Sequence, residues 1–212
     1  VIKPGSMKLW QKDKASLKEV EVFTTGKDRE MDMYLAAYDV IGSLAHVQML
    51  ESVGLLTKPE LIQLQKELKS IYKKIEKGKF ELSGNTEDIH SQIEVYLTQK
   101  LGDTGKKIHA ARSRNDQVLV DIKLFLRYKL EKLTGAIRPF FELLQLKSEI
   151  FKDHLLPGYT HLQLAMPSSF GLWFGAYAES LVDDLVTVKA AYDVVNKNPL
   201  GSAAGYGSSF PI

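Results

Sequence analysis

Three short polar segments carry the residues best suited to chemistry in this sequence. The first is Lys106–Gln117, which places Arg112, Ser113, Arg114 and Asn115 directly before a long stretch with apolar residues at helical spacing. The free N–H groups of a helix N-terminus attract anions, and guanidinium groups bind carboxylates through paired hydrogen bonds. The segment therefore predicts a site for a polar ligand that carries carboxylates, although a capped helix with solvated arginines explains the same residues.

The second polar segment is Leu156–Gln163, in which a Pro-Gly pair predicts a tight turn and Thr160, His161 and Gln163 follow. Histidine exchanges protons near neutral pH, so His161 is a candidate for acid or base work. A lone histidine in a turn is also often a structural hydrogen-bonding group. The segment alone leaves both interpretations open.

The third polar segment is Asn198–Ser209, which is rich in glycine and serine. It lacks the terminal Lys-Ser/Thr of a phosphate-binding loop and the dinucleotide-binding pattern, so a loop beside a ligand and a simple linker both fit it. On the helix before the first segment, His90 and Glu94 lie four residues apart, which favours an intrahelical ion pair. With no His-Glu-x-x-His pattern and no cysteine, the sequence predicts no metal site and no cofactor.

The composition is that of an ordinary globular protein. The 212 residues are 44% hydrophobic and 25% charged, and 28 basic residues nearly balance 26 acidic ones. This balance gives no excess of positive charge that would favour binding to nucleic acid or to anionic lipid. No apolar run is long enough to span a membrane and no secretory leader opens the chain. The absence of cysteine excludes a disulfide scaffold and is compatible with a reducing cytosol.

Both ends of the chain look artificial. Residues 1–6 end in Gly5-Ser6 before Met7, a junction typical of a cloning remnant, so Met7 is the predicted native start. The other end stops at Ile212, in a loop with no helix cap or charged tail. We expect the chain to be the front part of a longer protein.

The elements that must position these segments are predicted to be helices. Apolar residues recur every three or four positions, and capping signals separate the stretches: Thr57 with Glu60 at a helix start, and Gly54, Gly78 and Gly102 at helix ends. The predicted helical stretches are 31–49, 61–75, 89–101, one of nearly 40 residues from about 113, and 170–195. Few regions resemble strands, so the predicted fold class is all-α.

The helices fall into two predicted domains. Residues 7–111 are predicted to form a compact N-terminal helical domain, and residues 112–212 the first, incomplete part of a central bundle of long helices, with Pro139 as the site of a kink. Two helices this long would bury little as a lone hairpin. They are predicted to join a bundle formed by several subunits, or one completed by the missing part of the same chain.

The order of the polar strings resembles the argininosuccinate lyase branch of the fumarase/aspartase superfamily. The resemblance extends from about Leu9 to the end of the chain. The strings that carry it, in order, are Glu87-Asp88-Ile89-His90, Arg112-Ser113-Arg114-Asn115-Asp116-Gln117, Pro157-Gly158-Tyr159-Thr160-His161-Leu162-Gln163 and Pro199-Leu200-Gly201. The second and third strings are the most specific to this branch.

The resemblance implies an all-helical C–N lyase of arginine biosynthesis that cleaves argininosuccinate reversibly to arginine and fumarate, as a cytoplasmic homotetramer without cofactor. Members remove a proton next to a carboxylate and expel a guanidinium nitrogen. Such a reaction needs fixed donors for the developing dianion and a proton for the leaving nitrogen.

The same resemblance implies roles for individual residues. Arg112, Ser113, Arg114 and Asn115 would hold the substrate carboxylates and amino-acid end. Thr160 and His161 would be catalytic, with Thr160 on the fumarate-side carboxylate and His161 linked to proton transfer. The remaining substrate contacts would come from Gln163, from His90 of a neighbouring subunit and from Asp32.

The chain departs from the family pattern at several positions. Asp28 stands where many members have a substrate-binding serine, and Leu164, Met166 and Ala110 replace residues usual around the two motifs. The family's Gly-Ser-Ser-x-Met-Pro-x-Lys-x-Asn loop, which bears the serine that acts as base, does not occur in this sequence. The resemblance therefore implies that the chain by itself is inactive.

Two other functions fit a chain of this kind. One is a non-enzymatic helical assembly like the lens crystallins recruited from this family, and the other is a related lyase such as adenylosuccinate lyase. The intact Thr160-His161 and Arg-Ser-Arg-Asn strings argue against a protein that has lost its chemistry.

Overall fold

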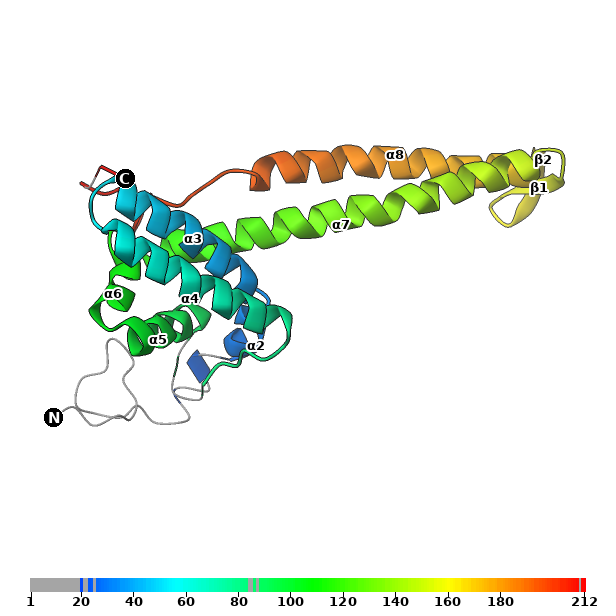
Figure 1. The fold of residues 1–212 in the computed structure, drawn as a ribbon. Helices are drawn as coiled ribbons and strands as arrows, with labels where there is room; N and C mark the ends of the chain where they lie inside the picture. Colours follow the sequence, from blue (N-terminus) through cyan, green and yellow to red (C-terminus); the bar gives the residue numbers. More distant parts are fainter. Residues whose placement is uncertain (1–19, 21–22, 25, 84–85, 87, 210) are drawn as a thin grey trace. The chain divides into compact units, whose positions relative to one another are not determined.

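A computed structural model describes residues 20, 23–24, 26–83, 86, 88–209 and 211–212 of the chain (Figure 1). The predicted cloning remnant, the start at Met7 and Glu87 of the first motif lie outside these residues. The elements are α2 Asp28–Asp32, α3 Ala36–Ser52, α4 Lys58–Glu76, α5 Ile89–Leu101, α6 Asp103–Lys106, a 3₁₀ turn Lys107–His109, α7 Arg114–Ile150, β1 Leu155–Thr160, β2 Gln163–Ser169 and α8 Phe170–Val195. Helices dominate and the described sheet has two strands, which confirms the predicted fold class.

The chain divides into two compact units. Of the described residues, the first contains those up to Phe125 together with those from Asn198 onward, and the second is Leu126–Lys197. The division falls within α7, which belongs to both. The domain boundary expected between residues 111 and 112 concerns the complete protein and stays a prediction.

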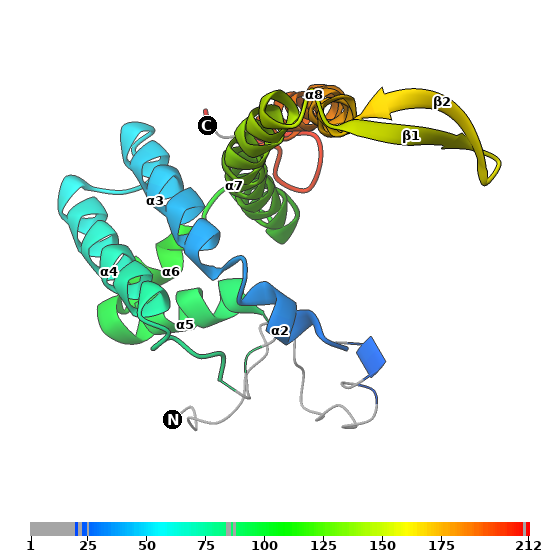
Figure 2. The same cartoon turned by 90° about the vertical axis from the view of Figure 1, so that its right-hand side faces the viewer.

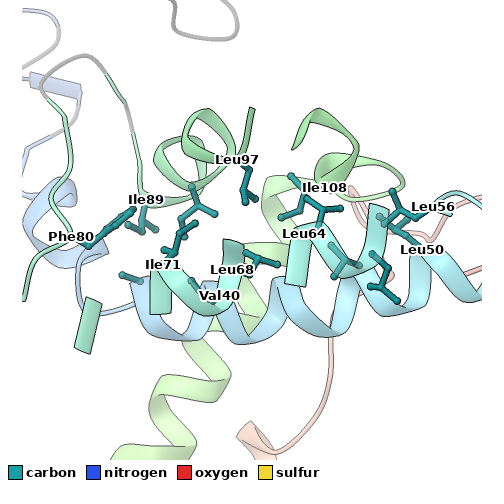
Figure 3. Close-up of a cluster of buried hydrophobic side chains, with 14 residues drawn as sticks. Val40, Leu50, Leu56, Leu64, Leu68, Ile71, Phe80, Ile89, Leu97 and Ile108 are labelled. Atoms are coloured by element: carbon teal, nitrogen blue, oxygen red, sulfur yellow. The ribbon is translucent and has the colours of Figure 1, made fainter. Parts of the chain in front are cut away.

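The core of the first unit lies between α3, α4 and α5 (Figure 3). On α4 the buried residues Leu61, Leu64, Leu68 and Ile71 repeat at intervals of three or four, so they form one face of the helix. Each such leucine or isoleucine contributes about 1.5–3 kcal/mol by its removal from water. Figure 2 shows α3 and α4 running side by side in this unit. The periodicity of the sequence thus predicted the buried faces of α4 and α5 correctly. Over residues 31–49 the expected apolar stripe was wrong, because Met31, Ile41 and Ala45 are exposed and α3 buries another face.

The predicted helix ends of the first unit are confirmed. Glu60 accepts hydrogen bonds from the backbone N–H and the hydroxyl of Thr57, at 2.8 and 2.9 Å, which secures the start of α4. Asp88, which was not among the predicted caps, caps α5 by accepting the N–H of Ser91 at 2.6 Å. Gly102 follows α5 with φ of +60°, a conformation that favours glycine.

The second unit is a helical hairpin made from α7 and α8. The Ser148 hydroxyl donates to the Gly171 carbonyl at 2.7 Å near one end, and Arg127 donates to Asn196 at 3.2 Å near the other. A Cβ atom at Gly171 would lie 2.6 Å from the Ser148 carbonyl oxygen, so only glycine permits this approach. The α7 helix continues through Pro139 without interruption.

Two strands connect α7 to α8, and the sequence prediction missed them. β1 and β2 pair antiparallel from Leu155 with Ser169 to Thr160 with Gln163. The turn lies at His161 and Leu162, whose φ angles of +50° and +63° are those of a two-residue hairpin loop, and not at the Pro-Gly pair. The hairpin escaped the sequence prediction because most of its side chains are exposed, so no apolar/polar alternation marks it.

None of the helices within the described ranges is both long enough and apolar enough to cross a membrane.

Candidate functional site

The turn that leads into α7 is held from both sides by polar contacts. Asp116 accepts the N–H of Ser113 at 3.0 Å, and the Ser113 hydroxyl accepts the N–H of Asn115 at 3.3 Å. On the other side, His46 of α3 bonds through Nε2 to the Ala110 carbonyl at 2.9 Å. The side chain of Asn115 is exposed and that of Ser113 half-buried, so both stay available to a ligand.

Asp116 also joins this turn to a distant part of the chain. Its Oδ2 atom accepts the backbone N–H groups of Gly201 and Ala203 at 3.1 and 2.9 Å, and the side chain is fully buried. One carboxylate therefore fixes the Arg112–Asn115 string against the Pro-Leu-Gly string. The sequence placed Asp116 at the helix start but assigned it no such role.

Arg114 connects the turn to α5. Its guanidinium donates to Glu94 at 3.1 Å, to Ser91 at 3.3 Å and to Gln117 at 2.9 Å, and lies 3.8 Å from Asp88. The intrahelical pair expected for Glu94 is wrong, because Glu94 lies against Arg114 from another element. The side chain of Arg114 remains 28% exposed, which leaves part of the guanidinium open.

A buried polar cluster lies beneath the turn, between α3, α5 and α7. His90 Nδ1 is 3.0 Å from Asp39 Oδ1 and 3.5 Å from Asp121 Oδ2, and these three side chains are at most 2% exposed. Gln117 donates to the same Asp39 oxygen at 2.5 Å. His90 thus lies in the interior of its own chain, and its predicted contribution to a neighbouring subunit's pocket stays a prediction.

Arg112 brings a positive charge to the same cluster. Its guanidinium donates to the Ser43 hydroxyl at 3.1 Å, and the residue is 9% exposed. Burial acts against the charge on Asp39, but the hydrogen bond and charge of His90 and the charge of Arg112 outweigh it and lower the pKa of Asp39 to about 2. Burial, reinforced by the charge of Asp39, raises the pKa of Asp121 to about 10.

Asp39, His90 and Asp121 are also the described residues whose donor atoms come close enough together, within 4.8 Å, to suggest a cation. Two observations favour a hydrogen-bonded cluster instead: Nδ1 of His90 and Oδ1 of Asp39 stand at hydrogen-bond distance, and Arg112 already supplies a positive charge. The sequence did not predict this grouping.

Asp32 lies at the edge of this region. Its carboxylate accepts the N–H of Ile89 at 3.3 Å, at the start of α5. Burial raises the pKa of this half-buried group. Its predicted role at the arginine-like end of a substrate stays a prediction.

The remaining predicted residues belong to the second unit. Thr160 is the last residue of β1, His161 the first of the turn and Gln163 the first of β2, and the side chains of all three are exposed. The hairpin thus presents them together at its tip. The first unit contains the other predicted residues.

His46 is expected to make the stability of the first unit depend on pH. Burial, followed by the charge of Arg112, lowers the pKa of His46 from 6.5 to about 4. Between these values the unfolded chain binds a proton that the folded chain does not. Stability is therefore lost as pH falls from 6.5 to 4, by up to about 3 kcal/mol.

Urea unfolding of the chain and of its His46→Gln variant, at neutral pH and at about pH 5, measures this effect. Glutamine can still donate to the Ala110 carbonyl but does not titrate, so the variant should lose less stability on acidification. The same change at the exposed His154 is the control. An equal pH dependence in wild type and His46→Gln would contradict the assignment.

The structure places in this region buried polar residues that the sequence prediction did not single out, namely Asp39, Ser43, His46, Gln117 and Asp121. A signal was present. Asp39, Ser43 and His46 follow one another at intervals of four and three, on the same face of α3 as its buried apolar residues. Polar groups buried on an apolar face need partners and therefore indicate a network.

Comparisons with known proteins agree with this description. Residues 18–212 match the family described as Lyase. The chain is 60% identical over 207 residues to the argininosuccinate lyase of Bacteroides thetaiotaomicron and 61% identical to that of Parabacteroides distasonis, covering 98% of this chain and 46% of each relative. It spans about half the length of these curated relatives.

Among solved structures, an EDDS lyase variant with bound fumarate superposes with a TM-score of 0.73 at 25% identity. The match covers 94% of this chain and 39% of that one.

Proposed function

The chain belongs to the lyase family, and from that premise we propose that the complete protein is an argininosuccinate lyase, which cleaves argininosuccinate reversibly to arginine and fumarate. The identity to proteins of that name, over nearly the whole chain, carries the proposal. The ordered polar strings support it independently, because one buried carboxylate, Asp116, ties two of them together.

The reaction is a β-elimination. A base removes a proton from the carbon next to a carboxylate, the electron pair forms the new C=C bond, and the C–N bond breaks. The nitrogen leaves with the bonding electrons and takes a proton, so that fumarate and the guanidinium of arginine result. The intermediate carries a second negative charge on the carboxylate, and preorganised donors lower its energy.

We assign the donors to the turn before α7 and to the hairpin tip. Ser113, Arg114 and Asn115 keep accessible side chains and would hold carboxylates and the amino-acid end of the substrate. The guanidinium of Arg112 is buried against Ser43, which favours a supporting role that fixes the turn. Its predicted direct contact with substrate stays a prediction.

At the hairpin tip, Thr160 would donate to the fumarate-side carboxylate and His161 would take part in proton transfer, with Gln163 as a further hydrogen-bonding group. His161 adopts a left-handed backbone in the turn, and its side chain is exposed. His90 would help to complete the pocket from a neighbouring subunit, and Asp32 would contact the arginine-like end of the substrate.

The proposal is tested with the full-length protein, which is expected to form fumarate from argininosuccinate, measured by the ultraviolet absorbance of fumarate. Adenylosuccinate is the control substrate and should not react. The 212-residue chain alone is expected to be inactive, because the family's serine-bearing loop is not in its sequence. Absence of turnover by the full-length protein would refute the proposal. Binding of a substrate analogue without turnover would favour the crystallin-like alternative.

We further propose that the full-length protein assembles as a cytoplasmic homotetramer through α7 and α8. Both helices expose large apolar side chains, which in water favour association. Those with roughly half or more of their surface exposed include Leu133, Phe140, Leu146, Ile150, Leu172, Trp173, Tyr177 and Val186. Light scattering should give four times the monomer mass, and a monomer at micromolar concentration would refute the assembly.

A further inference from the structure

Three carboxylate oxygens in the cluster beneath the turn have no hydrogen-bond partner. They are Oδ2 of Asp39 and both oxygens of Asp121, on side chains that are 1% and 0% exposed. An ionised carboxylate without partners is strongly disfavoured inside a protein, and buried carboxyl groups that cannot find a cation take up a proton instead. The positions of the three atoms therefore require an explanation.

We propose that Asp39 and Asp121 share a single proton, and that Asp39, held as the anion of the pair, is the positioning residue of His90. The proton resides on Asp121 and is donated to the free oxygen of Asp39, so one proton supplies partners to both residues. The second part of the inference, which concerns catalysis, rests on the proposed lyase function.

The charges around the pair agree with one proton. Two ionised carboxylates would face a single buried guanidinium, that of Arg112, whereas one carboxylate balances it. The directions of the two pKa shifts also agree with one shared proton. Burial and the charge of Asp39 raise the pKa of Asp121, while His90 and Arg112 lower the pKa of Asp39. Two carboxyl groups in close contact do not both ionise, because their negative charges repel each other.

The groups that face Asp121 come from several elements. Asp32 at the end of α2 and Asp39 of α3 add negative charge, whereas Arg112 before α7 opposes it. His90 of α5 lies 3.5 Å away. A Cβ at Gly42 of α3 would lie 3.4 Å from Asp121 Oδ1, so the helices approach closely and the carboxyl group has little room for a compensating water.

The contact between Asp39 and His90 determines which ring nitrogen carries the proton. An anionic Asp39 accepts from Nδ1–H at 3.0 Å, and in the neutral imidazole this leaves Nε2 as the acceptor. Gln117 donates to the same Asp39 oxygen and thereby keeps the carboxylate in place. A histidine fixed in this way can receive a hydrogen bond or a proton on Nε2 only.

The shared proton is tested by infrared difference spectroscopy on the chain, comparing wild type with Asp121→Asn. The C=O stretch of a protonated carboxylic acid should be present in wild type at neutral pH and absent from the variant. Asp184→Asn, which changes an exposed aspartate of α8, is the control and should leave the band in place. A wild type without that band at neutral pH overturns the proposal.

Zinc or cobalt chloride added to the same samples tests the alternative that a cation binds between Asp39, His90 and Asp121. No change in melting temperature is expected. A metal-dependent rise that Asp121→Asn abolishes would show that a cation, and not a proton, belongs between the carboxylates.

The positioning role is tested with Asp39→Leu, by the ¹⁵N chemical shifts of His90 and by the kinetics of the full-length protein. Leucine fills similar space but offers no acceptor to Nδ1–H, so His90 should lose its preference for the Nδ1–H tautomer. We expect kcat to fall about 10–100-fold, with a smaller change in KM and an altered pH profile. An Nδ1–H tautomer that survives in the variant, or an unaltered kcat and pH profile, would refute the role. If the full-length protein lacks lyase activity, the infrared spectra still show whether the two carboxyl groups share a proton. The ¹⁵N shifts still show which tautomer His90 adopts.

Discussion

His161→Asn is expected to lower the kcat of the full-length protein with argininosuccinate by about 10²–10⁴-fold, the range for loss of a general acid or base. The fold should be unaffected, because the side chain is exposed and asparagine tolerates the left-handed backbone that His161 adopts. Steady-state fumarate production gives kcat and KM, and far-ultraviolet circular dichroism checks the fold.

The matched control for this prediction is His154→Asn. It makes the same chemical change at another exposed histidine of the second unit, where the ring packs edge-on against Phe151. Activity there should stay within a few-fold of wild type. A kcat near the wild-type value in His161→Asn would exclude a direct role for His161, whereas equal losses in both variants would point to a general disturbance of the hairpin.

Asp116→Ala is expected to cost the first unit about 3–5 kcal/mol, because three hydrogen bonds to one buried carboxylate are lost together. The N–H groups of Ser113, Gly201 and Ala203 all lose their acceptor. Urea unfolding measures the loss. Hydrogen exchange at Gly201 and Ala203 should accelerate, since the loop is released from the turn.

Asp116→Asn and Asp103→Ala give the comparison for Asp116. Asparagine keeps the shape and one acceptor oxygen, so its effect should be intermediate. Asp103 is an exposed residue of α6 that pairs with Lys106, and its loss should change stability by less than about 1 kcal/mol. A change of that small size in Asp116→Ala would show that the turn and the loop hold together without the carboxylate.

The sequence by itself determined the long helices and indicated the polar strings to which we assign the chemistry. Period and capping decide helix formation locally, which is why the core face of α4, the cap at Thr57 and the end of α5 at Gly102 were predictable. The motif strings around Arg112 and His161 were recognisable for a similar reason. A polar segment that interrupts apolar periodicity can be read from the sequence alone.

Only the tertiary structure decided which of these residues meet. The partners in the polar cluster come from α3, α5 and α7, and no periodicity relates Asp39 to Asp121 or Asp116 to Gly201. The hairpin escaped prediction because its exposed strands carry no burial pattern, and its stability comes from pairing between residues on either side of His161. Pairing and ionisation inside a protein depend on which groups share one small dry volume, and that is fixed by the packing of whole elements.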